Sequence, residues 1–521
     1  MSVRRSPVLL SLEAQEFYTV HNPSKTTVFE NPQQVAFQLL EQPGRFRSPL
    51  TLLERLRLRV SALSPWPDTF SFADAFLARS LSPIAPAWQV LLHYLIRRGV
   101  IENEPWLKRS NHDSPKLPAV RFFLQGLNRN TISGTGYAFD LETAFSKALG
   151  EGLERFFLFP TKLARQRVDV RASTAGMKYH HKRFVHPETL TQFSLEQREQ
   201  SKRFQFNETS AFAWIRVPEL VSGKSVFVPA QCFSLERFTV DKKREPLLRE
   251  QNTNAAAGGF TLQEALLSAI YEAVERDGFL IYWLNTIAPV RLDVSDCQDA
   301  EFLQLLSQLE RYRIEACFLD TTTDTGIPSC ICVLIDRSSA GPGIAIGGGC
   351  NFQIERMLRS SLVEAFSILG NFNRIHLSQS VPKTGYQPFS DGTIGIHERV
   401  RIWKQPDMFS RAEFFLSGQK KSLAEAYPER KVFGTASEEL DYVTDLFRSL
   451  GAGYEIYYAE KEHEVLNTIG YYVVKVLIPE LVSLYLSETN AGLGACRLKS
   501  VPHKIGRVPS EYWNYWPHPF P

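Results

Sequence analysis

The stretch EALLSAIYEAVERDGF, residues 264–279, has the hydrophobic pattern of an amphipathic helix. Its apolar stripe, at helical spacing, is formed by Leu266, Leu267, Ile270, Ala273 and Val274. The opposite face carries Ser268, Glu272 and Glu275, so the helix presents two carboxylates one turn apart in an E-x-x-E-R pattern. The question raised by this stretch is whether the acidic face is simply solvated or holds a ligand.

A second copy of the pattern lies earlier in the chain, in AFSKALGEGLERFF at residues 144–157. Here Glu151 and Glu154 occupy the polar face, and Lys147 is placed for an ordinary i,i+4 ion pair with Glu151. One such helix is explained well enough as a solvated surface, since Glu and Arg are good helix formers. Two copies favour a shared role, because like charges one turn apart repel unless a cation compensates them. Carboxylates facing one cleft would suit Mg²⁺ that holds phosphates.

Small residues precede both helices, in SGTGYAFD at residues 133–140 and NTNAAAGGFTLQEA at residues 252–265. Backbone can approach a ligand closely at such places. Neither stretch is a P-loop, and GPGIAIGGG at residues 341–349 misses the spacing of a Rossmann dinucleotide site. A nucleotide site in this chain would therefore belong to a less common fold.

The composition is that of a globular protein, with 521 residues, 44% hydrophobic and 22% charged. A formal net charge of +3 argues against nucleic-acid binding, and the seven cysteines contain no C-x-x-C pair. The apolar run near the N-terminus and the one near residue 480 are both interrupted by charges, so neither a secretory signal nor a membrane span is predicted. We expect a cytoplasmic protein.

The chain is predicted to have two domains. Residues 1–118 read as strand, helices and a helix that ends at Gly99, the pattern of a small winged-helix-like domain. A polar linker with two prolines, residues 108–120, follows it. Residues 119–521 alternate helices with short β-rich runs, which predicts an α+β domain.

Taken in order, these segments resemble the YcaO family of ATP-dependent peptide-modifying enzymes. The resemblance covers about residues 120–521 and includes SGTG, ALGEGLERF, TNAAAGGFTLQEALLSAIYEAVERDGFLIYWL, GGGCNFQIERMLRSSLVEAF and the terminal PHPFP. It implies a YcaO-type ATP-binding fold in which glutamates surround Mg²⁺-bound ATP. Carried over by position, the metal ligands are Glu151, Glu154, Glu272 and Glu275, and the nucleotide-binding residues are Asn254, Ser268, Arg359 and Glu364.

The chain departs from the family pattern at two places. The first loop commonly reads Gly-Lys-Gly in the family and is Gly134-Thr135-Gly136 here, so a lysine that faces the phosphates has to come from elsewhere. The serine expected four residues before the first glutamate is replaced by Lys147. Arg276 and Asp277 are interpreted as structural, because Arg-Asp pairs at helix ends often only brace a fold.

A terminus of the form P-x-P-x-P resembles the members of the family that make azoline rings. The implied reaction is attack of a Cys, Ser or Thr side chain on the preceding amide, then phosphorylation of the oxygen by ATP and loss of phosphate. Proline makes the tail stiff, so it could complete a site at little entropic cost. The catalytic candidates are Pro517, Pro519, Pro521 and, as the weaker one, His518.

The resemblance also implies partners: a ribosomally made precursor peptide, a ubiquitin-activating-like protein that binds its leader, a flavin dehydrogenase, and an oligomeric complex, as in thiazole/oxazole-modified microcin (bacteriocin) maturation. The N-terminal unit is predicted either to bind the leader or to dock the partner. Two alternatives remain open: formation of a thioamide or amidine by the same activation, and a scaffold without catalytic activity that only binds the precursor.

Overall fold

The structure is a computed structural model. It describes residues 115–126, 131–159, 167–235, 238–240, 243–338, 342–372, 388–389, 394–463, 466–467 and 470–520, and short stretches between residues 17 and 108. The chain forms two compact units. Unit 1 comprises residues 1–166, 257–265 and 460–474, and unit 2 comprises residues 167–256, 266–459 and 475–521.

Unit 1 is built on an antiparallel sheet with the order β1-β2-β3-β4. Its strands are β1 (Phe17–Thr19), β2 (Trp106–Lys108), β3 (Ala119–Gln125) and β4 (Thr131–Tyr137). Helix α5 (Leu141–Leu158) packs on β3 and β4. The helix begins after Asp140, whose side chain accepts a hydrogen bond of 2.7 Å from Thr143 N.

Two glycines allow this strand and helix to approach closely. A Cβ at Gly134 would lie 2.1 Å from Ala148 O, and one at Gly136 would lie 2.0 Å from Ala144 O. Both distances are far below van der Waals contact. The small residues of this strand are therefore needed for packing of β4 on α5.

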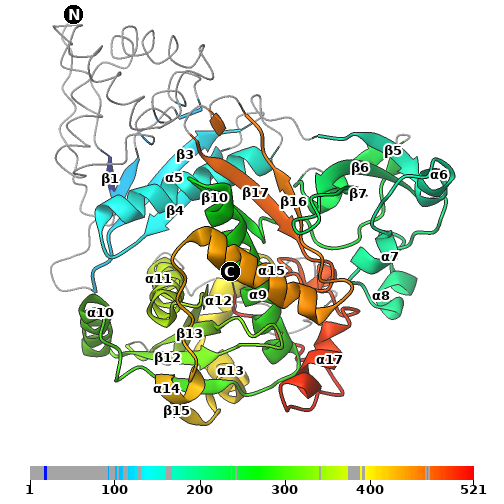
Figure 1. Cartoon of the computed structure of the whole chain (residues 1–521). Coiled ribbons are helices and arrows are strands. Elements are labelled where there is room, and N and C mark those ends of the chain that lie inside the picture. Colours follow the sequence, from blue (N-terminus) through cyan, green and yellow to red (C-terminus); the bar gives the residue numbers. More distant parts are fainter. Residues whose placement is uncertain are drawn as a thin grey trace, which may run out of the picture. The chain divides into compact units, whose positions relative to one another are not determined.

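Unit 2 contains a five-stranded sheet with the order β14-β13-β12-β11-β15. Its strands are β11 (Val290–Asp293), β12 (Ile314–Asp320), β13 (Ser329–Asp336), β14 (Gly343–Cys350) and β15 (Lys420–Ser422). Neighbours are antiparallel except β11 and β15, which run parallel. Helix α11 (Ile354–Phe372) packs on β13 and β14, and α10 (Ala300–Arg311) packs on β12 (Figure 1).

Three smaller sheets among the described residues have the orders β10-β17-β16, β5-β6-β7 and β8-β9. Their strands are β5 (Val170–Ser173), β6 (Ala211–Pro218), β7 (Ser225–Pro229), β8 (Thr239–Val240), β9 (Lys243–Arg244), β10 (Ala256–Gly259), β16 (Tyr457–Glu460) and β17 (Tyr472–Leu477). The other helices with described bounds are α6 (Thr174–Tyr179), α7 (Pro187–Leu190), α8 (Leu195–Gln200), η3 (Ala230–Cys232), α9 (Leu262–Leu284), α12 (Ile396–Trp403), η4 (Pro406–Met408), α13 (Phe409–Leu416), α14 (Leu423–Ala426), α15 (Ala436–Leu450), η5 (Glu488–Asn490) and α17 (Arg497–Lys504).

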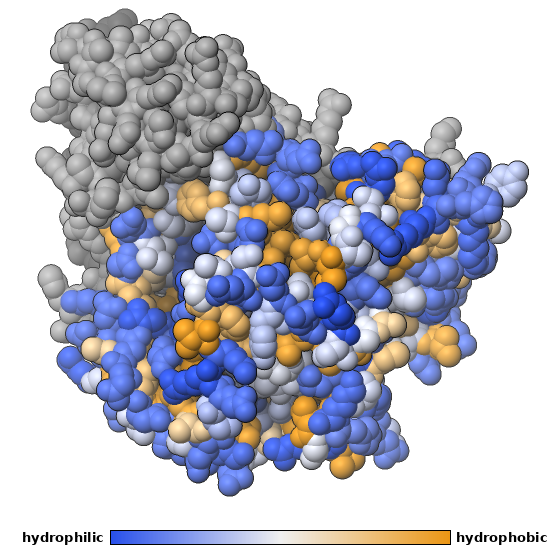
Figure 2. Space-filling view, viewed as in Figure 1, coloured by the Kyte–Doolittle hydropathy of each residue, from blue (hydrophilic) through white to orange (hydrophobic). Residues whose placement is uncertain are grey.

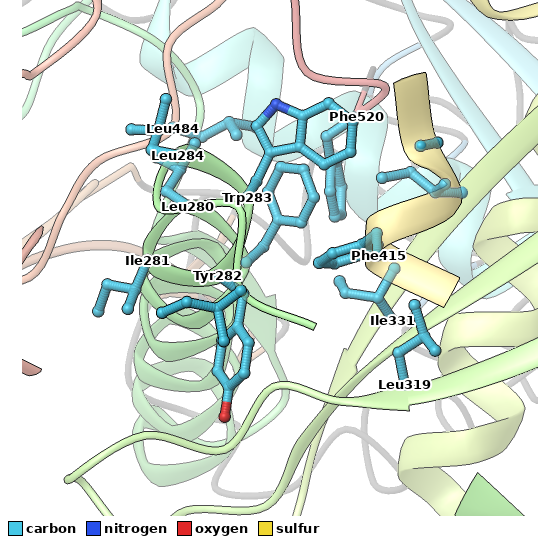
Figure 3. Close-up of a cluster of buried hydrophobic side chains, with 14 of the residues drawn as sticks. Leu280, Ile281, Tyr282, Trp283, Leu284, Leu319, Ile331, Phe415, Leu484 and Phe520 are labelled. Atoms are coloured by element: carbon cyan, nitrogen blue, oxygen red, sulfur yellow. The ribbon is translucent and has the colours of Figure 1, made fainter. Parts of the chain in front are cut away.

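Helix α9 is the predicted acidic helix, and its start has the expected chemistry. Thr261 Oγ1 accepts from Glu264 N at 3.1 Å, and Glu264 Oε2 accepts from Thr261 N at 3.2 Å, a reciprocal capping box. Its C-terminal half lies in the main core of unit 2, where Trp283 packs near Phe415 and Phe520 (Figure 3). The core thus includes a residue from the last five of the chain.

The observed mixture of helices and sheets confirms the predicted α+β class. The predicted winged-helix-like domain of residues 1–118 falls almost entirely outside the described residues, and its boundary stays a prediction. The described β2 and β3, on either side of that boundary, pair in one sheet.

Hydrophilic residues cover most of the visible described surface, with hydrophobic residues in small groups between them (Figure 2). None of the helices in the described part of the chain has the length and hydropathy needed to cross a membrane.

Candidate active site

In unit 2, Glu272 and Glu275 of α9 and Glu364 of α11 surround one guanidinium, that of Arg276. Arg276 lies 3.0 Å from Glu275, 3.3 Å from Glu364 and 3.5 Å from Glu272, measured between nitrogen and oxygen atoms. Three carboxylates therefore share a single arginine. We call these four residues the carboxylate cluster.

Backbone amides hold two of the carboxylates in place. Ala255 N donates to Glu272 Oε2 at 3.1 Å, and Gly348 N donates to Glu364 Oε2 at 2.6 Å. Gly348 also leaves room for the third carboxylate, because a Cβ there would lie 2.2 Å from Glu275 Oε1. Charge-assisted hydrogen bonds from the main chain thus fix Glu272 and Glu364 without adding a further side-chain cation.

The same arrangement occurs in unit 1. Thr135 N donates to Glu151 Oε2 at 2.5 Å, and Arg155 pairs with Glu151 at 2.6 Å. Arg155 also donates to Ser133 O at 2.8 Å, which ties the helix to the strand before it. Burial raises the pKa of Tyr471, and the charge of Glu154, a partly buried residue of α5, acts in the same direction.

The pattern thus occurs three times, and only two of its copies carry the E-x-x-E-R motif. In each copy a small-residue segment donates a backbone N–H to a glutamate on the helix that follows, and the glutamates are Glu151, Glu272 and Glu364. In the third copy, SSLVEAFSI at residues 360–368, the second glutamate and the arginine are replaced by Ser367 and Ile368. The signal that would have found it is the small residue three positions before each glutamate and the small residue directly after it.

Burial and crowding of like charges perturb the carboxylate cluster. Burial raises the pKa of Glu275 to about 8, and the neighbouring carboxylates of Glu364 and Glu272 act in the same direction. Burial also raises the pKa of Glu272, while Arg276 opposes the rise. Arg276 Nε makes no hydrogen bond to any described residue. A further cation at the cluster would relieve this repulsion.

The donor set fits Mg²⁺ held together with phosphates. Across the described residues, no group of three or more His, Cys, Asp or Glu side chains is arranged to hold a metal ion by itself. Mg²⁺ usually keeps several waters and takes one or two carboxylates plus substrate phosphates. Half-buried carboxylates in excess of their cation are suited to that mode of binding, and Glu272 keeps 27% of its side chain exposed.

The other predicted nucleotide-binding residues lie in varied surroundings. Asn254 Nδ2 donates to Leu484 O at 3.1 Å, and Ser268 is exposed on α9 one turn before Glu272. Arg359 forms ion pairs with Asp299, at the start of α10, and with Glu301 at 2.9 Å. A phosphate contact by Arg359 would have to compete with these carboxylates, and its assignment stays a prediction.

The C-terminal tail is buried in unit 2. The ring of Phe520 lies 3.8 Å from the guanidinium carbon of Arg276, so the tail contacts the carboxylate cluster directly. Trp403 Nε1 donates to Pro517 O at 2.9 Å, and His518 Nε2 lies 2.7 Å from Tyr485 O. Burial lowers the pKa of His518 well below its usual value. Pro519 is buried as well, and Pro521 lies outside the described residues.

Asp277, next to Arg276, has the bracing role that was predicted for it. It accepts from Arg497 at 2.9 and 2.6 Å and from Val482 N at 2.9 Å, and both charged side chains are buried. This pair joins α9 to α17. Arg276 was predicted to be structural only. Its position within the carboxylate cluster makes it part of the candidate site as well.

The structure is thus an α+β protein whose helices present glutamates held by backbone amides, and its sequence has neither the P-loop nor the Rossmann glycine spacing. The chain matches the family described as YcaO cyclodehydratase, ATP- and Mg²⁺-binding, over residues 135–482. Since that match covers more than half of the chain, the protein belongs to the YcaO family. The family expected from the sequence is thereby confirmed, and its description includes the expected cofactors ATP and Mg²⁺.

Two curated relatives match part of the chain. An uncharacterised protein in the tfuA 3′ region of Rhizobium leguminosarum bv. trifolii is 30% identical over 161 residues, which is 29% of this chain and 37% of the relative. An uncharacterised protein of Methanothermobacter thermautotrophicus is 26% identical over 156 residues, 30% of this chain and 40% of the relative. The matched part of the chain thus spans less than half of the length of each relative.

Solved structures share the fold at low sequence identity. A heterocyclase in complex with substrate and cofactor has a TM-score of 0.62 at 19% identity, covering 79% of this chain and 54% of the other. YcaO from Methanopyrus kandleri, bound with AMPPCP and Mg²⁺, has a TM-score of 0.54 at 15% identity, covering 78% and 92%. The E. coli microcin synthetase McbBCD complex gives 0.52 at 13% identity, covering 75% and 92%.

Proposed function

We propose that the protein is an ATP-dependent cyclodehydratase that converts Cys, Ser or Thr residues of a ribosomally made precursor peptide into thiazoline or oxazoline rings. The observation that carries the proposal is the buried C-terminal tail, whose Phe520 stacks on Arg276 of the carboxylate cluster. The tail sequence resembles that of azoline-forming members of the family, and its position next to the cluster suits a part in the same site.

The proposed reaction balances as the loss of one water from the peptide. The side-chain sulfur or oxygen gives up its proton to solvent and bonds to the preceding carbonyl carbon, and the resulting oxyanion takes the terminal phosphoryl group of ATP, which leaves ADP. Phosphate then leaves from carbon, and the amide nitrogen loses its proton to form the ring C=N bond. Mg²⁺, when bound, neutralises charge on the phosphates.

The residues of the chain would contribute mainly position and electrostatics, as phosphoryl transfer demands. Glu151, Glu154, Glu272 and Glu275 are proposed as metal ligands, and Glu364 with Asn254 and Ser268 as part of the nucleotide site. Arg359 would have to leave its ion pairs to join them. His518 is buried and favours its neutral form, so we assign it a positioning role for the tail rather than proton transfer.

The partners proposed are the precursor peptide and a leader-binding protein of the ubiquitin-activating type, within an oligomeric complex, with a flavin dehydrogenase acting on the rings afterwards. One structure that shares the fold is itself a component of a complex, the E. coli microcin synthetase McbBCD. This supports partner proteins in general and does not identify them. A cytoplasmic location remains part of the proposal.

The test is the intact mass of a precursor rich in Cys and Ser after incubation with the protein, its partner and Mg·ATP. We expect a loss of about 18 Da per ring, one water for each phosphate released. A mass gain from sulfur replacing oxygen would indicate thioamide formation instead. ATP hydrolysis and peptide mass both unchanged, while the peptide still binds, would favour a scaffold without catalytic activity.

A further inference from the structure

Unit 2 contains a pocket of about 390 Å³ that is lined in part by Glu245. This volume lies within the range of ligand-binding pockets. None of the described residues that line it belongs to the carboxylate cluster, to the C-terminal tail or to the predicted nucleotide-binding residues. The pocket is therefore a separate feature of the unit, and the steps of the proposed reaction do not use it.

Hydrogen bonds connect the segments that form the wall of this pocket. Leu247 N donates to Arg203 O at 2.9 Å, which joins the segment after α8 to the segment after β9. The side chain of Gln231, from η3, donates to Pro246 O at 2.9 Å and accepts from Leu248 N at 2.9 Å. The wall is thus formed before a ligand binds, so binding requires little ordering of the protein.

Three cations from two segments of the chain line the pocket. Lys202 and Arg203 follow α8, Arg244 is the last residue of β9, and all three residues are exposed. Neither Lys202 nor Arg244 forms an ion pair with another described residue. A single exposed cation is normally solvated, whereas several cations around one concave site attract an anionic ligand.

Glu245 is the one acidic residue among the described residues that line the pocket. Its two oxygens accept hydrogen bonds from Ala213 N and from Gln231 Nε2, each at 2.8 Å. Burial raises the pKa of Glu245 to about 7, so near neutral pH it carries only part of its negative charge. The pocket therefore has a net positive charge.

Part of the wall is apolar. Phe238 and Leu247 line the pocket and are 5% and 8% exposed, and Pro246 lies beside them in the wall. A ligand that matches the whole pocket has negative charges next to an apolar group. The net charge of +3 over 521 residues argues against a nucleic acid as this ligand. A peptide segment in which Asp or Glu residues adjoin an apolar residue has the required composition.

We propose that this pocket binds an acidic segment of the substrate peptide, outside the residues that become rings. The carboxylates of the segment contact Lys202, Arg203 and Arg244. An adjoining apolar side chain lies on Phe238 and Leu247. The proposal rests on the proposed function, which supplies the peptide, and adds a second place at which the chain holds it.

The test uses a fluorescent synthetic peptide in which glutamates flank a phenylalanine, and the same peptide with glutamines in place of the glutamates. Binding to the full chain is followed by fluorescence anisotropy. A charge-assisted hydrogen bond is worth about tenfold or more in affinity. We expect the glutamate peptide to bind at least about tenfold more tightly than the glutamine peptide, and this difference to shrink at high salt.

The variant Lys202→Glu/Arg244→Glu reverses two of the three charges at exposed positions. We expect it to weaken binding of the glutamate peptide by about tenfold or more. The matched control is Lys182→Glu/Lys224→Glu, which makes the same change in net charge at two exposed lysines outside the pocket. It should bind the glutamate peptide within about twofold of the wild-type protein. Equal losses in the two variants would show a response to net charge alone and would overturn the proposal.

Two competitors identify other occupants. Free glutamate that displaces the peptide at equal concentration would indicate a site for a small dicarboxylate instead of a peptide. Displacement by Mg·ATP would make the pocket part of the nucleotide site. Either result would overturn the proposal, and we expect neither.

A second readout uses only the wild-type protein and so does not depend on the folding of a variant. Trace acetylation is followed by peptide mapping. We expect the glutamate peptide to slow modification of Lys202 and to leave Lys182 unchanged, and equal rates at Lys202 with and without the peptide would overturn the proposal. Ring formation on a precursor without binding of the glutamate peptide would leave the proposed function intact. Binding of the glutamate peptide without ring formation or ATP turnover would instead contradict the proposed function and keep the pocket as a peptide site.

Discussion

Arg276 is one cation among three carboxylates. Each carboxylate has different contacts, so its role can be tested by its own substitution. Glu364 accepts from the backbone at Gly348 and pairs with Arg276, so a neutral amide could keep the hydrogen bond while losing the charge. The charge of Glu364 can therefore be removed by substitution with Gln while its side chain stays packed in place.

We expect Glu364→Gln to lower Mg²⁺-dependent ATP turnover by about 100-fold, because two to three kcal/mol of charge stabilisation is lost from the site. The free energy of unfolding should change by less than about 1 kcal/mol. The control is Glu355→Gln on the same helix, which removes an exposed ion pair with Arg430. Turnover within twofold of wild type for Glu364→Gln would remove Glu364 from the proposed site.

A second carboxylate gives a pH-dependent prediction away from the cluster. Burial raises the pKa of Glu245 to about 7, although Ala213 N and Gln231 Nε2 each donate to it at 2.8 Å. The folded protein then holds this proton more tightly than the unfolded chain does. Stability should therefore fall as pH rises from about 4.5 to 7 and level off above that.

Glu245→Gln has no carboxyl at this position, so its free energy of unfolding should not show this decrease. The difference between the variant and the wild type should therefore shift in favour of the variant by up to about 3 kcal/mol between pH 4.5 and pH 8. Urea unfolding at several pH values measures the difference. Parallel stability curves for the two proteins would show that Glu245 titrates in the folded state as it does in the unfolded chain.

At the scale of the element, the site depends on strands that approach helices closely. Gly347 and Gly349 of β14 lie against the backbone of α11, and Gly348, between them, lies against Glu275 of α9. Because side chains alternate along a strand, one run of three glycines contacts two helices on its two faces. This explains a glycine run that lacks the spacing of a dinucleotide site.

Gly347→Ala is expected to destabilise the protein by about 1–3 kcal/mol, since its Cβ would lie 2.2 Å from Ala365 N and 2.5 Å from Ser361 O. ATP affinity should fall as well, because β14 also carries the N–H that holds Glu364. The control, Gly176→Ala in α6, meets only ordinary contacts from 3.5 Å outward and should be neutral or slightly stabilising. Equal unfolding midpoints for the two variants would contradict the close packing.

At the scale of the whole molecule, the end of the chain is part of the core of unit 2. Phe520 is fully buried and packs with Phe279 at 5.0 Å between ring centroids, in addition to its contact with Arg276. The tail therefore contributes both to the stability of unit 2 and to the carboxylate cluster, and shortening it would change both.

Phe520→Ala should cost about 3–5 kcal/mol in the free energy of unfolding and should also lower ring formation. Tyr512→Ala is the control, since Tyr512 is 76% exposed shortly before the tail and should change stability by less than about 0.5 kcal/mol. Chemical denaturation measures the first effect and peptide mass the second. Wild-type stability of Phe520→Ala would show that the tail does not pack in solution as it does here.

The sequence by itself determined the α+β class, the YcaO family and the two acidic helices. These follow from local information, since helical periodicity places Glu272 and Glu275 on one face whatever surrounds them. The family resemblance added Glu364, although not its contacts. The winged-helix-like domain stays a prediction, because most of its residues lie outside those described.

Only the tertiary structure decided how the glutamates are held and which residues surround them. The N–H of Gly348 donates to Glu364, the ring of Phe520 stacks on Arg276, and the ammonium of Lys475 donates to Asn252 O. The two residues of each pair are distant in sequence or lie on different elements. Periodicity says which face of a helix is buried and nothing about the atoms that cover it. The atoms that contact the acidic face are determined by the packing of the whole unit, and these contacts position the glutamates as a candidate site.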